Sequence, residues 1–113
     1  MKEIKAIFRP SRLLEVTEEL QKIEGLPGVT VSEIRGFGKS RAKNAKDKVV
    51  YEMVEFIPRI QLEVVVNDEM VDEVVNTIQK YAHTGNTGDG KIFVSTIDDT
   101  VKIRTNERGP DAI

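Results

Sequence analysis

The sequence is most informative at first through what it lacks. Its 113 residues include no cysteine, no tryptophan and a single histidine. The absence of cysteine excludes disulfides, thiolate zinc sites, iron–sulfur clusters and cysteine nucleophiles, and a lone imidazole excludes clustered histidine ligands and most triad chemistry. No window approaches the roughly 18 apolar residues of a membrane span, and the first residues lack an apolar signal core. Most enzyme classes are therefore disfavoured, no metal site is expected, and the expected location is the cytoplasm.

The composition predicts one globular domain over residues 1–113. Hydrophobic residues make up 39% of the chain but aromatic residues only 5%, so the core must consist mainly of valine, isoleucine and leucine. A domain of this size buries a modest share of its surface, and association with further copies would add to that burial. The net charge of −2 argues against a general binder of polyanions, so any basic function must be local.

The first third of the chain shows a strand, a helix and a second strand. Ile4, Ala6 and Phe8 alternate with Lys5, Ile7 and Arg9 until Pro10, which is the pattern of a half-buried strand. Ser11 is the expected cap of an amphipathic helix that Gly25 stops. The apolar face of this helix is expected at Leu13, Val16, Leu20 and Ile23. A second strand is expected over residues 29–34.

The remainder repeats these elements in a different order. A long strand is expected over residues 54–66, with Pro58 at an edge or bulge because proline lacks the ladder donor. Asn67 and Asp68 can begin a helix over residues 70–82, strands are expected at 91–97 and 100–105, and a polar tail ends the chain. This order predicts an α+β ferredoxin-like βαββαβ fold with an extra C-terminal strand and an antiparallel sheet.

The glycine-rich stretch between the second helix and the next strand is the best candidate site. From Gly85 to Lys91 it fits G-x-x-x-x-G-K, but Ile92 follows where a P-loop has serine or threonine. The loop also leads from a helix into a strand, which excludes a P-loop NTPase. Backbone N–H groups and one lysine remain, and they suit phosphate binding without hydrolysis, although a plain glycine turn is an equal alternative. His83, just before the loop, is expected to end the helix or cap the loop.

Two further groups of cations are candidates for local function. Lys102 and Arg104 share one face of the expected last strand and could form a three-cation phosphate clamp with Lys91 of the same or a neighbouring subunit. A solvated edge strand is the alternative. Residues 39–48 carry five cations and one anion, which predicts a basic loop projecting from an acidic body. A loop of this kind favours docking to a partner protein.

The chain resembles the PII signal-transduction family along nearly its whole length. Thr84-x-x-x-Gly88-Asp89-Gly90-Lys91-Ile92-Phe93-Val94 matches the family's C-terminal signature, and Gly36-Phe37-Gly38, Phe56-Ile57-Pro58 and Lys102-Ile103-Arg104-Thr105 are in register with it. The resemblance implies a homotrimer that binds ATP or ADP, with AMP as a third candidate, in clefts between subunits. It also implies a T-loop at residues 39–53 that contacts a target protein, a glycine B-loop at 83–91 and a C-terminal loop and tail at 102–113.

The resemblance further implies roles for individual residues. The nucleotide phosphates would contact Gly88, Asp89, Gly90 and Lys91 of one subunit, with Lys102 and Arg104 added by its neighbour. The base of the T-loop would close over the nucleotide through Gly36, Phe37, Gly38 and Lys39. The base or ribose would contact Thr30, Glu63, Val65 and Thr87. No cofactor beyond the nucleotide is implied, and the residues leave the presence of Mg²⁺ open.

Two departures from the family pattern bear on the effector and on modification. Ser40 stands where the family has a glutamine that helps to hold magnesium and 2-oxoglutarate, although Arg59 lies where a basic residue reaches the oxoacid. We therefore expect weak or absent 2-oxoglutarate binding, with another small anion left open. Tyr51 lacks the flanks of the family's uridylylated tyrosine, so no uridylylation is expected. The pattern is similar to that of divergent members that are encoded beside membrane-transport genes, which makes a membrane transporter the expected class of target.

Two other function classes stay open at this point. A small nucleotide-hydrolysing enzyme could use the same glycine loop, with Ser40 or Asp89 managing water or metal. A nucleic-acid-binding module could act through residues 39–48, although no aromatic residue lies among these cations and the whole chain is acidic. The leading prediction is a non-enzymatic, nucleotide-binding regulator.

Overall fold

The computed structural model describes residues 1–38 and 56–113. The described residues form four strands and two main helices: β1 (Lys2–Phe8), α1 (Leu13–Gln21), β2 (Thr30–Gly36), β3 (Ile57–Val66), α4 (Val71–Ala82) and β4 (Lys91–Thr96). Short 3-10 turns at Pro10–Arg12 and Asp68–Met70 begin the two helical segments, and a third at Gly109–Ala112 ends the chain. The expected T-loop, residues 39–53, lies outside the described residues.

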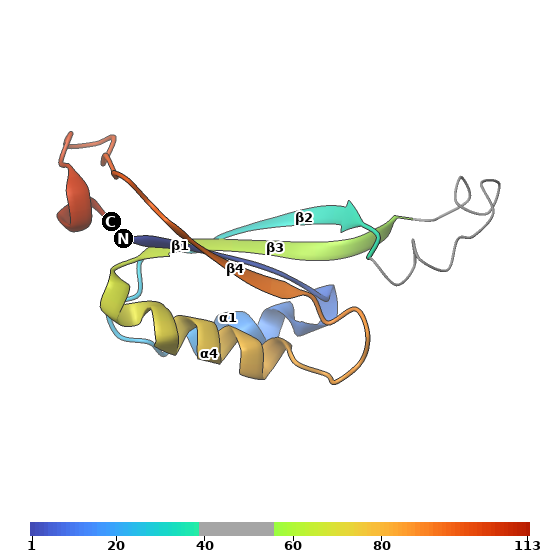
Figure 1. The fold of residues 1–113 in the computed structure, drawn as a ribbon. Helices are drawn as coiled ribbons and strands as arrows, with labels where there is room; N and C mark the ends of the chain where they lie inside the picture. Colours follow the sequence, from blue (N-terminus) through green and yellow to red (C-terminus); the bar gives the residue numbers. More distant parts are fainter. Residues whose placement is uncertain (39–55) are drawn as a thin grey trace.

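The four strands form one sheet in the order β2-β3-β1-β4, and each neighbouring pair is antiparallel. Both helices cover one face of this sheet, while no helix among the described residues lies on the other face (Figure 1). Ile4 pairs with Val64 and Val94, so the even-numbered residues of β1, β3 and β4 face the helices. The ferredoxin-like fold predicted from the order of elements is confirmed.

The core is aliphatic, as the composition predicts, with Phe8 as its one fully buried aromatic residue among the described positions. It lies between the even-numbered side chains of β1 and β3 and the inner faces of α1 and α4. The residues at the centre of the core are Ile4, Ala6, Phe8, Val16, Leu20, Ile60, Leu62, Val64, Val66, Val74 and Ile78. Their period of two on the strands and three to four on the helices is the pattern that made both element types predictable.

The structure corrects the start of the first helix. Ser11 does not cap it, because Ser11 lies inside the 3-10 turn Pro10–Arg12 and the cap position of α1 is Arg12, which makes no side-chain cap bond. Pro10 opens that turn, and its fixed φ angle suits the first residue of a helical segment. Pro58 lies where β3 extends past β1, so its missing N–H group affects no β1 pairing.

The structure also corrects the end of the chain, because the expected strand at residues 100–105 is not formed. Val101 makes only an isolated bridge with Arg108, and Ile103–Thr105 form a turn between them. The Lys102 N–H donates to the Glu107 carbonyl at 2.9 Å, and the Asn106 N–H donates to the Lys102 carbonyl at 2.7 Å. Asn106 has φ 65°, a left-handed conformation that asparagine tolerates well, so the polar tail folds back on itself.

Candidate anion-binding site at the glycine loop

The glycine loop connects the end of α4 to the start of β4 and packs tightly on the end of β1 (Figure 1). Gly90 has φ +102°, and a Cβ atom built on it would lie 1.7 Å from the carbonyl oxygen of Ile7. Only glycine fits there. Close backbone contact between this loop and β1 therefore explains why the motif requires glycine at this position.

Asp89 organises the loop from within. Its Oδ2 atom accepts hydrogen bonds from the backbone N–H groups of Thr84 and Gly85, each at 2.8 Å, and Oδ1 accepts from the Thr84 hydroxyl. Oδ1 also accepts from Arg9 Nε at 3.1 Å. The bonds from the Thr84 hydroxyl and backbone, followed by those from Gly85 and Arg9, hold the pKa of the Asp89 carboxyl well below its ordinary value. Asp89 is therefore a stable carboxylate at neutral pH.

Two guanidinium groups converge on Gly88, Arg59 from β3 and Arg9 from the position that follows β1. A Cβ atom built on Gly88 would lie 3.1 Å from Arg9 Nη2 and 3.2 Å from Arg59 Nη2. Arg9 Nη2 also donates to the Thr87 carbonyl at 2.6 Å, and Arg59 Nη1 donates to the Pro58 carbonyl at 2.8 Å. Among the described residues, Arg59 has no carboxylate within ion-pair distance, whereas Arg9 pairs with Asp89. An uncompensated guanidinium beside a glycine backbone favours an anion.

Lys91 adds a third cation at the same end of the sheet. It is the first residue of β4 and pairs with Ile7 of β1, which places it on the open face of the sheet together with Arg59. Three cations and one carboxylate give this region a local charge of about +2 in a chain whose net charge is −2. The glycine loop is thus the place in the described fold where a phosphate or carboxylate ligand is best accommodated.

Sequence reasoning missed Arg9. Its position follows from the strand pairing, because Arg9 directly follows β1 and the pairing of β1 with both neighbours brings residue 9 near residue 59 and the loop. His83 behaves as expected for the end of a helix: its backbone N–H donates to the Gln79 carbonyl at 3.1 Å, and its side chain is exposed.

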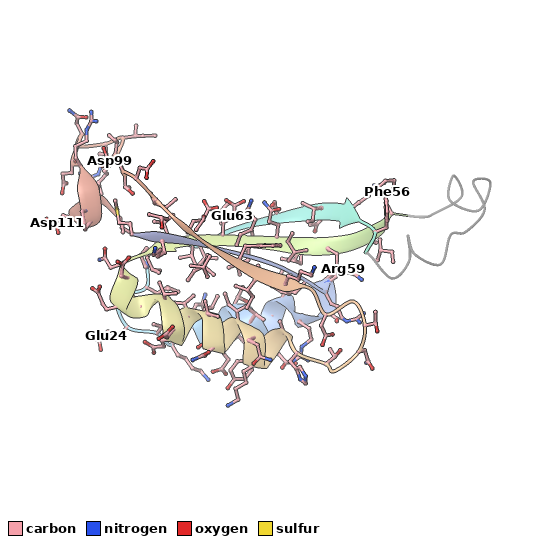
Figure 2. All side chains as sticks on the ribbon, in the orientation of Figure 1. Glu24, Phe56, Arg59, Glu63, Asp99 and Asp111 are labelled. Carbon is pink, nitrogen blue, oxygen red and sulfur yellow. The ribbon has the colours of Figure 1, made fainter. Side chains whose placement is uncertain are left out.

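The expected contacts to the base and ribose lie further along the open face. Thr30 pairs with Glu63, and Val65 follows two residues later on β3. The Gln61 side-chain amide donates to Glu63 Oε1 at 2.6 Å. Figure 2 shows Arg59 near the glycine-loop end and Glu63 nearer the middle of the sheet. Thr87, the remaining member of this set, belongs to the loop itself.

The base of the expected T-loop lies at the same end of the sheet as the glycine loop. Gly36 pairs with Ile57, and the rings of Phe37 and Phe56 make an edge-on contact with centroids 5.4 Å apart. Phe37 and Gly38 are the last described residues before the gap. Lys39 and Ser40 lie outside the described residues, so their predicted roles stay predictions.

Lys102 and Arg104 lie at the opposite end of the sheet. β4 runs from Lys91, which pairs with Ile7, to Thr96, which pairs with Lys2, and six strand residues span about 20 Å. The last turn follows beyond that end, where the chain terminates (Figure 1). The three-cation clamp with Lys91 is therefore not formed within one chain, and the turn also removes the period of two that would have put both cations on one strand face.

The described residues contain no helix that is long and apolar enough to cross a membrane. This finding concerns residues 1–38 and 56–113 alone.

Comparisons with known proteins agree with the fold and identify a family. The family model described as "Nitrogen regulatory protein P-II" matches residues 1–107. The chain is 43% identical to the Nitrogen regulatory protein P-II of Azospirillum brasilense, over all of both proteins. It is 46% identical to the Nitrogen regulatory protein P-II 2 of Methanothermobacter thermautotrophicus, over all of the chain and 97% of that protein.

A solved structure extends this similarity to three dimensions. The crystal structure of Arabidopsis thaliana PII bound to citrate has a TM-score of 0.79 and 39% sequence identity, over 99% of the chain and 91% of that protein. A full-length family match, relatives above 40% identity and a shared fold lead to one conclusion. The chain belongs to the nitrogen regulatory protein P-II family of signalling proteins.

Proposed function

We propose that this protein is a non-enzymatic signalling regulator that binds the phosphates of ATP or ADP at its glycine loop. The observation that carries the proposal is the convergence of Arg9 and Arg59 on Gly88, with Lys91 on the same face of the sheet. Two planar guanidinium groups recognise phosphate and carboxylate oxygens in a defined geometry, and the lysine adds a point charge. Family membership supports the signalling role.

A complete nucleotide site requires a second copy of the chain. Lys102 and Arg104 lie too far from the loop of their own chain, so we propose that a neighbouring copy supplies them in a homotrimer. Exposed apolar side chains support an interface: Phe93 on the edge strand β4 is 52% exposed, and Ile103 between the two cations is 99% exposed. Large apolar residues left this open in a protein of low aromatic content are typical of an interface. Light scattering at micromolar concentration should show a trimer, and a stable monomer would contradict this part.

We propose that a small anionic effector binds at Arg59, the guanidinium near Gly88 that no described carboxylate offsets. Support comes from the geometry at Gly88 and from the citrate in the similar Arabidopsis structure, since citrate is a polycarboxylate. Ser40 is too short to replace a glutamine amide as a magnesium ligand, so 2-oxoglutarate is expected to bind weakly. Titration of citrate and of 2-oxoglutarate, each with ATP and Mg²⁺ present, separates the two candidates.

The proposed output is contact with a target protein through residues 39–53, in the cytoplasm. Family membership and the excess of cations at residues 39–48 support protein docking, and a membrane transporter is the proposed class of target. A ligand can alter this contact only through a difference in its affinity for two states of the protein.

Calorimetry with ATP, ADP and AMP tests the nucleotide proposal directly. We expect saturable binding that Lys91→Ala weakens and that Lys80→Ala leaves unchanged, because Lys80 lies on α4 over the ring of Tyr81. Absence of binding by all three nucleotides would contradict the proposal. Phosphate release from ATP above the background rate would instead favour the nucleotide-hydrolysing alternative.

A further inference from the structure

The side chain of Asp89 points into the glycine loop, although its place in the motif suggests a ligand contact. Its two oxygens accept four hydrogen bonds, from the backbone N–H groups of Thr84 and Gly85, the Thr84 hydroxyl and Arg9 Nε. A carboxylate has about four lone-pair sites, so its hydrogen-bonding capacity is filled. It has no acceptor site left for a ligand.

Arg9 joins this carboxylate to the rest of the fold. Arg9 follows β1, and its guanidinium contacts Asp89 through Nε and the Thr87 carbonyl through Nη2 at 2.6 Å. It therefore bridges the sheet to two places in the loop, on either side of Gly88. Its charge also offsets that of Asp89, so the carboxylate does not oppose an anion at Gly88.

We propose that Arg9, Thr84 and Asp89 form a positioning network that holds the glycine loop in its anion-binding shape, and that the side chain of Asp89 does not itself contact the nucleotide. The absence of a contact between the Asp89 side chain and the nucleotide rests on the function proposed above. The network itself is a property of the free protein and can be tested without any ligand. The network gives Thr84 a role that the resemblance to the family did not imply. It also makes the Asp89 side chain a support for the loop and not a ligand contact.

Thr84→Val separates this proposal from direct contact by Asp89. Valine keeps the shape of threonine but removes the hydroxyl that donates to Asp89 Oδ1. Under the positioning role, this loss loosens the loop and weakens binding. If Asp89 instead contacts the ligand and Thr84 is only a loop residue, the same substitution has no effect. Thr84→Ser restores the hydroxyl and should restore both properties.

The first measurement is amide hydrogen exchange by NMR on the nucleotide-free protein. Thr84→Val loses the hydrogen bond from the hydroxyl to the charged Asp89 side chain. We therefore expect the backbone amides of residues 84 and 85 to exchange roughly tenfold faster in this variant than in the parent protein. Thr84→Ser should return the rate to the parent value. Arg9→Met, which removes the guanidinium, should also accelerate the exchange of these two amides. Unchanged exchange in Thr84→Val would overturn the network.

The second measurement is the affinity for ADP by calorimetry. We expect Thr84→Val to lower it about fivefold or more and Thr84→Ser to leave it near the parent value, with no change in melting temperature beyond that of Thr77→Val. Thr77 is the matched control because its hydroxyl bonds to the Glu73 carbonyl on α4, away from the loop. Equal ADP affinity in Thr84→Val and the parent would overturn the positioning role. If the parent protein binds none of ATP, ADP and AMP, the proposed function fails, and the exchange rates alone still decide the network.

Discussion

The two ends of the sheet carry cations in very different settings. At the glycine-loop end, Arg9 is held by a carboxylate and a carbonyl, and the loop beside it is built by internal hydrogen bonds. At the C-terminal end, Lys102 and Arg104 belong to a short turn whose bonds are made by its backbone and by neighbouring polar side chains. Among the described residues, neither Lys102 nor Arg104 forms an ion pair.

This contrast indicates that the glycine-loop end is pre-formed, and under the proposed function Lys102 and Arg104 find their partners in an anion and a second chain. A pre-formed site binds with little loss of conformational freedom, whereas a turn with free cations loses more on binding. The glycine loop is therefore expected to supply most of the discrimination for phosphate, and the turn to complete the site.

The largest expected effect comes from replacing a glycine with alanine at each end of the sheet. Gly90→Ala should destabilise the protein by about 2–5 kcal/mol, because the new Cβ overlaps the Ile7 carbonyl and φ is +102°. Gly109→Ala in the C-terminal tail, with φ +78° and open space around it, should cost only about 1–2 kcal/mol. Urea unfolding measures both. Equal losses would show that the loop does not pack on β1 as described.

The next effect concerns cations at the two ends. Lys91→Ala should weaken ADP binding roughly 10- to 100-fold, the range expected for one charge-assisted contact. Arg104→Ala should weaken it too, through the neighbouring copy. In trimers reassembled from equal amounts of the two variants, random assembly should leave about one quarter of the sites with both cations intact and so restore tight binding there. Failure to restore any tight site would contradict the shared site.

A smaller effect is expected for the small-anion position. Arg59→Ala should weaken citrate binding several-fold, because Arg59 is the guanidinium at Gly88 that no described carboxylate offsets. Arg108→Ala, at the other end, is the control and should change nothing, since Arg108 contacts the Asn106 side chain. Citrate affinity that is equal in all three proteins would remove Arg59 from the site.

The smallest effect is a pH dependence that should be absent near neutrality. The folded state lowers the Asp89 pKa below its ordinary value of 3.8, so the carboxylate stabilises the loop above that value and loses this contribution only as the pH falls through the lowered pKa. The NMR shift of the Asp89 carboxyl carbon should stay constant from pH 7 to about pH 4. Titration of this carbon near its ordinary pKa would show that the hydrogen bonds to Thr84 and Gly85 are not formed in solution.

Much of the architecture was predictable, because it follows from short-range patterns. The alternation in Ile4–Phe8 and the helical spacing of Val74 and Ile78 depend only on which side chains must avoid water. The glycine motif was predictable for a similar reason, since the positive φ angles at Gly88 and Gly90 exclude other residues locally. The resemblance to the PII family rested on this motif and on Gly36-Phe37-Gly38, Phe56-Ile57-Pro58 and Lys102-Ile103-Arg104-Thr105.

The errors lie where turns and strand register decide the outcome. Ser11 looked like a helix cap, but Pro10 had already begun a turn, and residues 100–105 looked like a strand, but the chain folds back and Val101 pairs with Arg108 instead. Arg9 gave no motif signal at all. It became part of the site only because the pairing of β1 with β3 and β4 brings it to Arg59 and Asp89, 50 and 80 residues away along the chain.

The sequence alone therefore determined the element types, the aliphatic core and the presence of an anion-suited glycine loop, since each depends on local conformation and on the burial of nearby side chains. Only the tertiary structure decided which cations meet at that loop and where Asp89 points. The physical reason is that strand register converts sequence distance into spatial contact: it joins Arg9, Arg59 and Gly88, and it sends Lys102 and Arg104 to the far end of the sheet. The pattern of residue types along the chain does not specify how the strands are aligned with one another.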